Sequence, residues 1–312
     1  MDDRLPTVGR IAGDRPGPTL ALLGAVHGDE LEGVLAIRLV LDRLRSNEFR
    51  GTIRWAAPAH PAAWAVDGRL GPADGKNLAR VFPGNAQGSP TERVAAHLTS
   101  ELIAGADLLI DLHSAGKNFD MPLLAGYHSA GPLADRSGAA TRAFAAPLLW
   151  QHPEASLGRS LSAAEAHGVP SLYVEGRGGG QIRQRDLDGY LHGVLRVMVH
   201  LGMLDPDTAR TPPAAPVTVV RGDGNTDEGI TAPVAGYFVS AAEVGDRLPA
   251  GGRIGIVLDD DGQQRATITA PTGGVLMLVR RGARVRTRDT LAIVAEIVSD
   301  TDGALGYEAG DR

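Results

Sequence analysis

The first two-thirds of the chain alternates short apolar runs with longer segments of helical spacing, and this alternation limits its folds more than any other feature. Buried strands are predicted at residues 19–26 (TLALLGAV), 52–57, 107–112 (DLLIDL) and 171–174 (SLYV). Helices are predicted at residues 31–46, from Ser89 to about residue 104, and at residues 186–204. Such an order favours an α/β fold, a sheet flanked by helices on both faces.

The character of the sequence changes near residue 205. Prolines at positions 206, 212, 213 and 216 predict a linker over residues 206–216. Beyond it, Gly- and Asp-rich turns separate short β-type runs at residues 253–258, 264–270, 275–279 and 291–297. We therefore expect a catalytic α/β domain (1–205), this linker, a small all-β domain (217–300) and a polar tail (301–312).

Composition and charge narrow the function classes. The 31 basic and 37 acidic residues give a net charge of −6, which gives no reason to expect nucleic acid or an anionic membrane as partner. No apolar run approaches the roughly 20 residues that span a bilayer, and no secretion signal is seen at the start. The absence of Cys excludes disulfides, thiolate ligands and a Cys nucleophile. We expect a cytoplasmic protein that acts on a small molecule, and the sequence is compatible with a homo-oligomer.

Three residues that follow predicted strands have the chemistry of a zinc site. His27 and Glu30 come directly after the first strand, and His113 directly after the strand that ends at Leu112. The carboxyl ends of strands in an open α/β sheet meet at one edge, where ligands bind. Two imidazoles and one carboxylate are a known ligand set of catalytic zinc, which lowers the pKa of its bound water to about 7.

A simpler interpretation exists for each of these residues. His-x-x-Glu is a weak pattern, His27 also fits a polar turn, and Glu30 fits a first-turn acid favoured by the helix dipole. Glu175 ends the strand 171–174 and precedes a Gly-rich stretch. A carboxylate at a third strand end is well placed to take a proton from metal-bound water and pass it to a leaving amine. Taken alone, Glu175 fits better as an ordinary strand-end acid before a flexible loop.

Four motifs together resemble the succinylglutamate desuccinylase/aspartoacylase family, which is related to the zinc carboxypeptidases. They occur in order as GAVHGDELEG (24–33), DGKNLARVFPG (74–84), DLHS (111–114) and VEGRGGG (174–180). The resemblance covers about residues 20–200, and the β-rich segment resembles the C-terminal domain of the family. It implies a zinc-carboxypeptidase-like mixed sheet flanked by helices, followed by a small all-β domain.

The same resemblance implies roles for individual residues. His27, Glu30 and His113 would bind one Zn²⁺ per chain, and Glu175 would be the general base. Arg69 would polarise the scissile carbonyl and stabilise the oxyanion, and Arg80 with Asn77 would bind the substrate. Guanidinium groups suit both tasks, because they donate bidentate hydrogen bonds to carboxylates and stabilise developing negative charge. The simpler interpretation of either arginine is a solvent-exposed charge in a loop, without a role in the site.

The chain departs from the family pattern beside the second arginine. Ala79 stands where the family has an Asn that helps to hold the substrate carboxylate, and His60 replaces another Asn upstream. We therefore expect poor turnover of acylated diacids, and better turnover where the amine part is larger or lacks a free α-carboxylate. The other seven His residues, His60 among them, are predicted to be structural or exposed.

The leading hypothesis is a zinc-dependent amidohydrolase that deacylates a small N-acylated amino acid or amine. Two alternatives stay open at this point. One is a deacylase or peptidase-like enzyme that acts on a specialised metabolite without a free α-carboxylate. The other is a family member that has lost catalysis and only binds a small ligand. The absence of a Gly-x-Ser-x-Gly motif disfavours a serine hydrolase.

Overall fold

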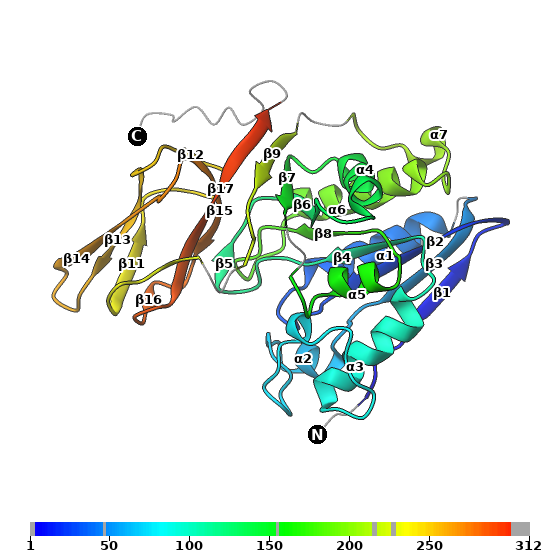
Figure 1. Cartoon of the computed structure of the whole chain (residues 1–312), viewed down its shortest axis with the longest axis horizontal. Coiled ribbons are helices and arrows are strands. Elements are labelled where there is room, and N and C mark those ends of the chain that lie inside the picture. The colour runs from blue at the N-terminus through cyan, green and yellow to red at the C-terminus, as the bar shows by residue number, and fades with distance from the viewer. Residues whose placement is uncertain (1–3, 46–47, 154–155, 214–216, 226–228, 301–312) are drawn as a thin grey trace.

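The computed structural model describes residues 4–45, 48–153, 156–213, 217–225 and 229–300. Within these ranges one long mixed sheet runs through the molecule (Figure 1). Its main path is β1 (Gly9–Ala12), β3 (Arg50–Ala56), β2 (Arg15–Gly24), β4 (Leu108–Leu112), β8 (Ser171–Glu175), β6 (Leu124–His128), β7 (Leu148–His152), β9 (Thr218–Arg221), β17 (Thr290–Asp300), β15 (Gly274–Arg280) and β12 (Arg247–Leu248). β5 (Phe119–Asp120) pairs with β15, and β10 (Ile230–Thr231) pairs with β17.

Helices cover both faces of the N-terminal part of this sheet. One face carries α1 (Glu32–Leu44), α4 (Ala134–Phe144) and α6 (Gln184–His200), and the other carries α3 (Pro90–Leu98) and α5 (Ser160–Ala166). Side chains of β2 alternate between the two cores: Leu20 and Leu22 pack with α1, whereas Ala21 and Leu23 pack with α3. A strand buried on both faces reads as a continuous apolar run, which explains the unbroken TLALLG sequence.

The structure confirms the α/β fold and the long elements predicted from the sequence. The predicted strand at 171–174 is β8, and the predicted helix at 186–204 is α6, which begins two residues earlier and ends at His200. At the start of α3, the Ser89 N–H donates to the Glu92 carboxylate at 2.8 Å, as the capping pattern predicts. The helix expected to reach residue 104 continues from α3 as a wider turn, η2 (Thr99–Ile103).

Several elements were not predicted. They are β1, β5, β6, β7, β9 to β12 and β16 (Arg284–Val285), the helices α4 and α5, and the short helical segments α2 (Pro61–Ala65), η1 (Leu78–Arg80) and α7 (Pro206–Ala209). The strands β6 and β7 matter most for the site, because they end beside it. α7 lies in the segment predicted as a linker.

The C-terminal part is all-β, as predicted. A second sheet, β14 (Gln264–Thr269), β13 (Arg253–Leu258), β11 (Gly236–Ser240) and β16, packs its apolar side chains against β15 and β17. β9 lies parallel to β7 and antiparallel to β17, so the long sheet continues past residue 217. The division into two domains and a linker stays a prediction, and the predicted tail 301–312 lies outside the described residues. No helix among the described residues is both long and apolar enough to cross a bilayer.

Candidate active site

His27 and Glu30 lie in the turn between β2 and α1. Gly28 lets this turn lie directly on α2, because a Cβ there would be 2.2 Å from the Ala63 carbonyl oxygen. The Gly28 N–H donates to the Gly68 carbonyl oxygen at 2.9 Å, which fixes the loop that carries Arg69. Close backbone packing therefore places residues from distant parts of the sequence at one point.

His113, which follows β4, lies beside this turn. Its N–H donates to the Val174 carbonyl oxygen at 2.8 Å, so the parallel pairing of β4 and β8 sets its position. Ligand atoms of His27, Glu30 and His113 all lie within 4.8 Å of one another, and the three residues are buried. The Glu30 carboxylate bridges the two imidazoles, with Oε1 at 2.6 Å from His27 Nδ1 and Oε2 at 2.8 Å from His113 Nδ1.

The outer nitrogen of each imidazole faces an oxygen atom. His27 Nε2 lies 2.9 Å from Asn77 Oδ1, and His113 Nε2 lies 3.0 Å from Asp111 Oδ2. Asn77 Oδ1 also accepts the Ala79 N–H at 2.9 Å, so it is an acceptor toward His27. Each imidazole is then protonated on Nε2 in its neutral form and presents an Nδ1 lone pair inward. Two such lone pairs and a carboxylate converge on one point, an arrangement whose donor set fits a metal cation.

The electrostatics of this cluster favour positive charge at His113 but not at His27, whose pKa is lowered by burial. Burial alone would raise the pKa of Glu30, but His27 and His113 together hold it well below its ordinary value. Burial alone would lower the pKa of His113, but Asp111 and Glu30 hold it well above its ordinary value. The two carboxylates around His113 therefore stabilise a cation at this point, whether a proton or a metal ion.

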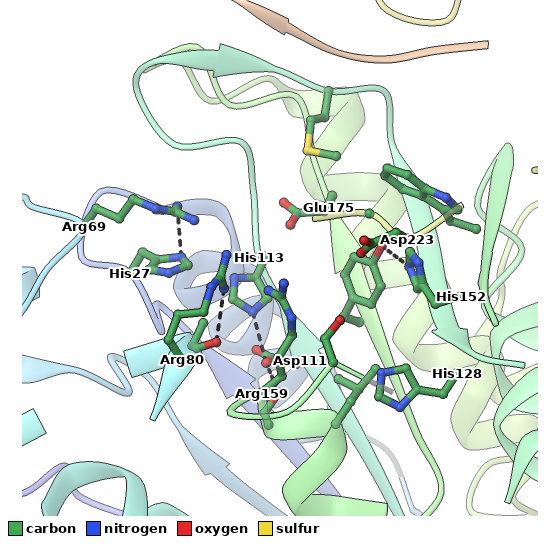
Figure 2. Close-up of a pocket in the computed structure, with 18 residues that line it drawn as sticks. His27, Arg69, Arg80, Asp111, His113, His128, His152, Arg159, Glu175 and Asp223 are labelled. Carbon is green, nitrogen blue, oxygen red and sulfur yellow. Dashed lines mark hydrogen bonds and ion pairs between the residues drawn. The ribbon is translucent and has the colours of Figure 1, made fainter. Parts of the chain in front are cut away.

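Glu175, the last residue of β8, faces the same cavity (Figure 2). Its Oε2 is buried and has no hydrogen-bond partner among the described residues. Burial raises the pKa of this carboxyl to about 8, and the charge of His113 partly opposes the shift. A buried, unpartnered carboxylate with a raised pKa is typical of a catalytic acid or base.

The two arginines predicted for the site line the cavity with Glu175. Arg69 Nη1 donates to Glu30 Oε1 at 3.0 Å, and its side chain is 41% exposed, so it reaches from the loop toward the His–Glu–His cluster. Arg80, at the end of η1, donates to the Ala79 carbonyl oxygen at 3.1 Å. Asn77 contacts the cluster directly, with its oxygen toward His27. The roles of these residues in binding substrate stay predictions.

The structure adds residues to this cavity that sequence reasoning missed. They are His128, Trp150, His152 and Tyr173 from β6, β7 and β8, Asp223 from the loop after β9, and Arg159 from the loop before α5. His128 and His152 each end a strand, but β6 and β7 run antiparallel to β8, so their carboxyl ends do not meet those of β2 and β4. The strand-end argument that identified His27 and His113 therefore does not apply to these two residues, and β6 and β7 themselves were not predicted. His152 is buried, as expected of a structural histidine, but it also faces the cavity.

The fold and these convergent groups define an α/β protein with a His–Glu–His cluster at the carboxyl ends of its parallel strands β2, β4 and β8. The catalytic-domain model of the succinylglutamate desuccinylase/aspartoacylase family matches residues 16–201, which is more than half of the chain. The chain therefore belongs to the succinylglutamate desuccinylase/aspartoacylase family, and the resemblance predicted from its motifs is confirmed.

Three relatives cover most of the chain. An N-alpha-acetyl-L-2,4-diaminobutyric acid deacetylase from Halomonas elongata is 29% identical over 90% of this chain and 83% of its own length. The crystal structure of a succinylglutamate desuccinylase from Silicibacter sp. TM1040 has a TM-score of 0.83 at 26% identity, covering 94% of this chain and 88% of that one. The product-bound ectoine utilization protein EutE (DoeB) from Ruegeria pomeroyi has a TM-score of 0.83 at 26% identity, covering 94% and 93%.

These relatives support the coarser part of the functional prediction, which is a hydrolase that cleaves the amide bond of a small acylated substrate. They also confirm the predicted architecture of a helix-flanked mixed sheet followed by an antiparallel one.

Proposed function

We propose that this chain is a zinc-dependent deacylase that removes the acyl group from a small N-acylated amino acid, with N-acetyl-2,4-diaminobutyrate as the model substrate. The observation that carries the proposal is the convergence of two imidazole Nδ1 atoms and the Glu30 carboxylate on one buried point. The substrate class comes from the deacetylase relative, which is 29% identical over 90% of the chain. The residues are those predicted from the sequence.

His27, Glu30 and His113 would hold the zinc. When bound, zinc acts as a Lewis acid and lowers the pKa of a water that it contacts. Asn77 and Asp111 keep both imidazoles in the tautomer that presents Nδ1, because each accepts from the outer nitrogen. Such outer partners typically change metal affinity by ~10–100-fold.

Glu175 would accept a proton from the attacking water and return it to the amide nitrogen as the C–N bond breaks. The atoms balance, since water adds OH to the acyl carbon and H to the leaving amine. Arg69 would donate to the oxygen on which negative charge develops, a task that suits a guanidinium already held at the cluster.

Arg80 would hold the substrate carboxylate. Its backbone packs against the segment that carries Arg159, since a Cβ on Gly158 would lie 2.4 Å from the Arg80 carbonyl oxygen. The guanidinium groups of Arg80 and Arg159 and the side chain of Ala79 all line the cavity. Arg159 is therefore a second arginine near the position where the family has an Asn and this chain has Ala79. Poor turnover of diacids, expected from Ala79, stays a prediction.

Metal analysis and turnover test this proposal together. Purified protein is expected to contain about one zinc per chain and to release acetate from N-acetyl-2,4-diaminobutyrate. His113→Ala should lose most of both, because it removes one of three ligands. His192→Ala, on the outer part of α6, is the matched control and should keep the metal. Full zinc occupancy in His113→Ala would overturn the ligand assignment.

A further inference from the structure

The wall of the cavity away from Arg69 and Arg80 contains a chain of three hydrogen-bonded groups. His152 Nδ1 lies 2.8 Å from the Gly222 carbonyl oxygen, and His152 Nε2 lies 2.7 Å from the Tyr173 hydroxyl oxygen. A carbonyl oxygen can only accept, so the Nδ1–H of His152 must be the donor. Burial lowers the pKa of His152 to about 4, so the imidazole is neutral near pH 7 and its Nε2 is an acceptor.

The hydroxyl of Tyr173 must therefore donate its proton to His152. Its remaining capacity is to accept, and Tyr173 lines the same cavity as Glu175. The two side chains lie on the same side of β8, because they are two residues apart on one strand. The hydrogen-bond chain thus leaves an acceptor, and no donor, on Tyr173 toward a ligand.

A carboxylate joins this acceptor from the loop after β9. Asp223 lies in the segment Gly222–Asn225, which is folded onto His152: a Cβ on Gly224 would lie 2.5 Å from the His152 ring. Asp223 lines the cavity, and its charge acts on His152 (Figure 2). The Asn225 N–H donates to Asp223 Oδ1 at 3.1 Å, which orients the carboxylate.

The cavity therefore contains charges of both signs. Arg80 lines it on the side of the His–Glu–His cluster, and Asp223 lines it beside the Tyr173 acceptor. The Arg159 guanidinium also lines the cavity, and its charge acts on Tyr173 and His152, so Asp223 is the carboxylate that offsets it there. A carboxylate on the substrate suits Arg80, and a group that only donates suits Asp223 and Tyr173. An ammonium group is such a donor, with three N–H bonds and no acceptor.

We propose that Asp223 and the Tyr173 hydroxyl form a subsite for the side-chain ammonium of the substrate and so select acylated diamino acids over acylated diacids and apolar amino acids. His152 is a positioning residue, because it acts through the hydroxyl of Tyr173. The identity of the ligand in this subsite rests on the proposed deacylase function. The subsite adds to that proposal the residues that determine which side chain of the substrate is preferred.

A matched pair of substrates tests the subsite. N-acetyl-2,4-diaminobutyrate and N-acetyl-2-aminopentanoate have side chains of equal length, but the second has a methyl group in place of the ammonium. The wild type should prefer the first by ~10-fold or more in kcat/KM, since a hydrogen bond to a charged group contributes that factor. Asp223→Asn and Tyr173→Phe should each reduce this ratio several-fold. Asp261→Asn, an exposed residue between β13 and β14, changes the net charge equally and should keep the ratio.

Binding of the product amino acids supplies a readout that does not need turnover. Calorimetry should show 2,4-diaminobutyrate binding more tightly than 2-aminopentanoate to the wild type and almost equally to Asp223→Asn. If the wild type does not distinguish the two ligands, or Asp223→Asn keeps the preference, the subsite is wrong even if both substrates are hydrolysed. If neither substrate is hydrolysed, the proposed function fails, and the calorimetric comparison still decides the subsite.

Discussion

At the scale of single residues, Glu175 has the most direct link to turnover. Its Oε2 is buried without a hydrogen-bond partner among the described residues, so no hydrogen bond there offsets the burial of this oxygen. Glu175→Gln keeps the shape and removes the basic oxygen. We expect zinc content to be retained and kcat to fall by ~10²–10⁴-fold, the usual contribution of a general base. Near-normal kcat in a fully loaded variant would mean that another group takes the proton.

The same carboxyl predicts a pH dependence of stability in zinc-free protein. Its pKa of about 8 in the folded state is above its ordinary value of 4.5, so the folded chain holds a proton there that the unfolded chain loses. This stability is complete below about pH 4.5 and is lost as the pH rises through 8. Glu175→Gln, which stays neutral, should thus be more stable than wild type at pH 8–9, by on the order of 1 kcal/mol or more.

Urea unfolding of chelated protein at pH 6 and pH 9 measures this difference. The free energy of unfolding of wild type should drop relative to Glu175→Gln between the two pH values. Parallel pH profiles for the two proteins would show that the carboxyl titrates normally and that its burial has no energetic consequence.

The His–Glu–His cluster and Glu175 could be predicted from the sequence, because these residues directly follow or end strands that have clear apolar patterns. His27, His113 and Glu175 follow or end continuous apolar runs, and an open α/β sheet brings such ends together. Tyr173 and Asp223 could not be found in this way. Their juxtaposition depends on the strand order β8, β6, β7, β9, which no local sequence pattern specifies.

At the scale of elements, the loop before η1 is held to α3 by one carboxylate. Asp74 accepts the Thr91 N–H at 2.9 Å, the Thr91 hydroxyl at 2.7 Å and the Lys76 N–H at 3.1 Å. Burial opposes ionisation, but the hydrogen bonds from Thr91 lower the pKa of Asp74 to about 2. This contact fixes the segment between Arg69 and Arg80 against a helix with a capped N-terminus.

Asp74→Ala should therefore lower both stability and activity. We expect a loss of ~1–3 kcal/mol in the free energy of unfolding at pH 7, because buried Thr91 loses its acceptor. Since the folded pKa of Asp74 is below 3.8, its contribution is present above pH 4 and is lost as the pH falls toward 2. Urea titrations at pH 7 and pH 3.5 measure the change, with Asp135→Ala on α4 as the control. Equal losses for both variants would refute the anchoring role.

The strands that were predicted have sequences typical of buried strands, whereas a missed strand such as β6 does not. The buried half of β2 is apolar, and β4 is apolar except for Asp111, because helices bury both faces there. β6 contains Gly126, a poor strand former, at the point where the Tyr173 ring crosses it: a Cβ there would lie 2.2 Å from that ring. Packing of an aromatic side chain from β8 requires this glycine, and the strand signal is lost as a result.

At the scale of the whole molecule, the long sheet joins the two predicted domains. Trp150 on β7 is 1% exposed and packs in a core with Val220, Val275 and Met277, which all lie beyond residue 217. β5, which follows His113 in the sequence, pairs with β15 of the C-terminal part. The C-terminal part therefore contributes the apolar cover of β7 and the carbonyl oxygen that orients His152.

This continuity predicts that residues 1–216 do not form an independent catalytic domain. Truncation there removes β9, leaves β7 as a sheet edge and exposes Trp150, whose packing alone is worth several kcal/mol. We expect the truncated chain to aggregate or to lack a cooperative thermal transition, with no deacylase activity. A chain ending at residue 300 keeps every described element and should fold and turn over substrate like the full chain. Circular dichroism and thermal melting of both proteins provide the comparison. A soluble 1–216 fragment with a cooperative transition and bound zinc would show that the predicted boundary separates two autonomous units and that the shared sheet is only a docking contact.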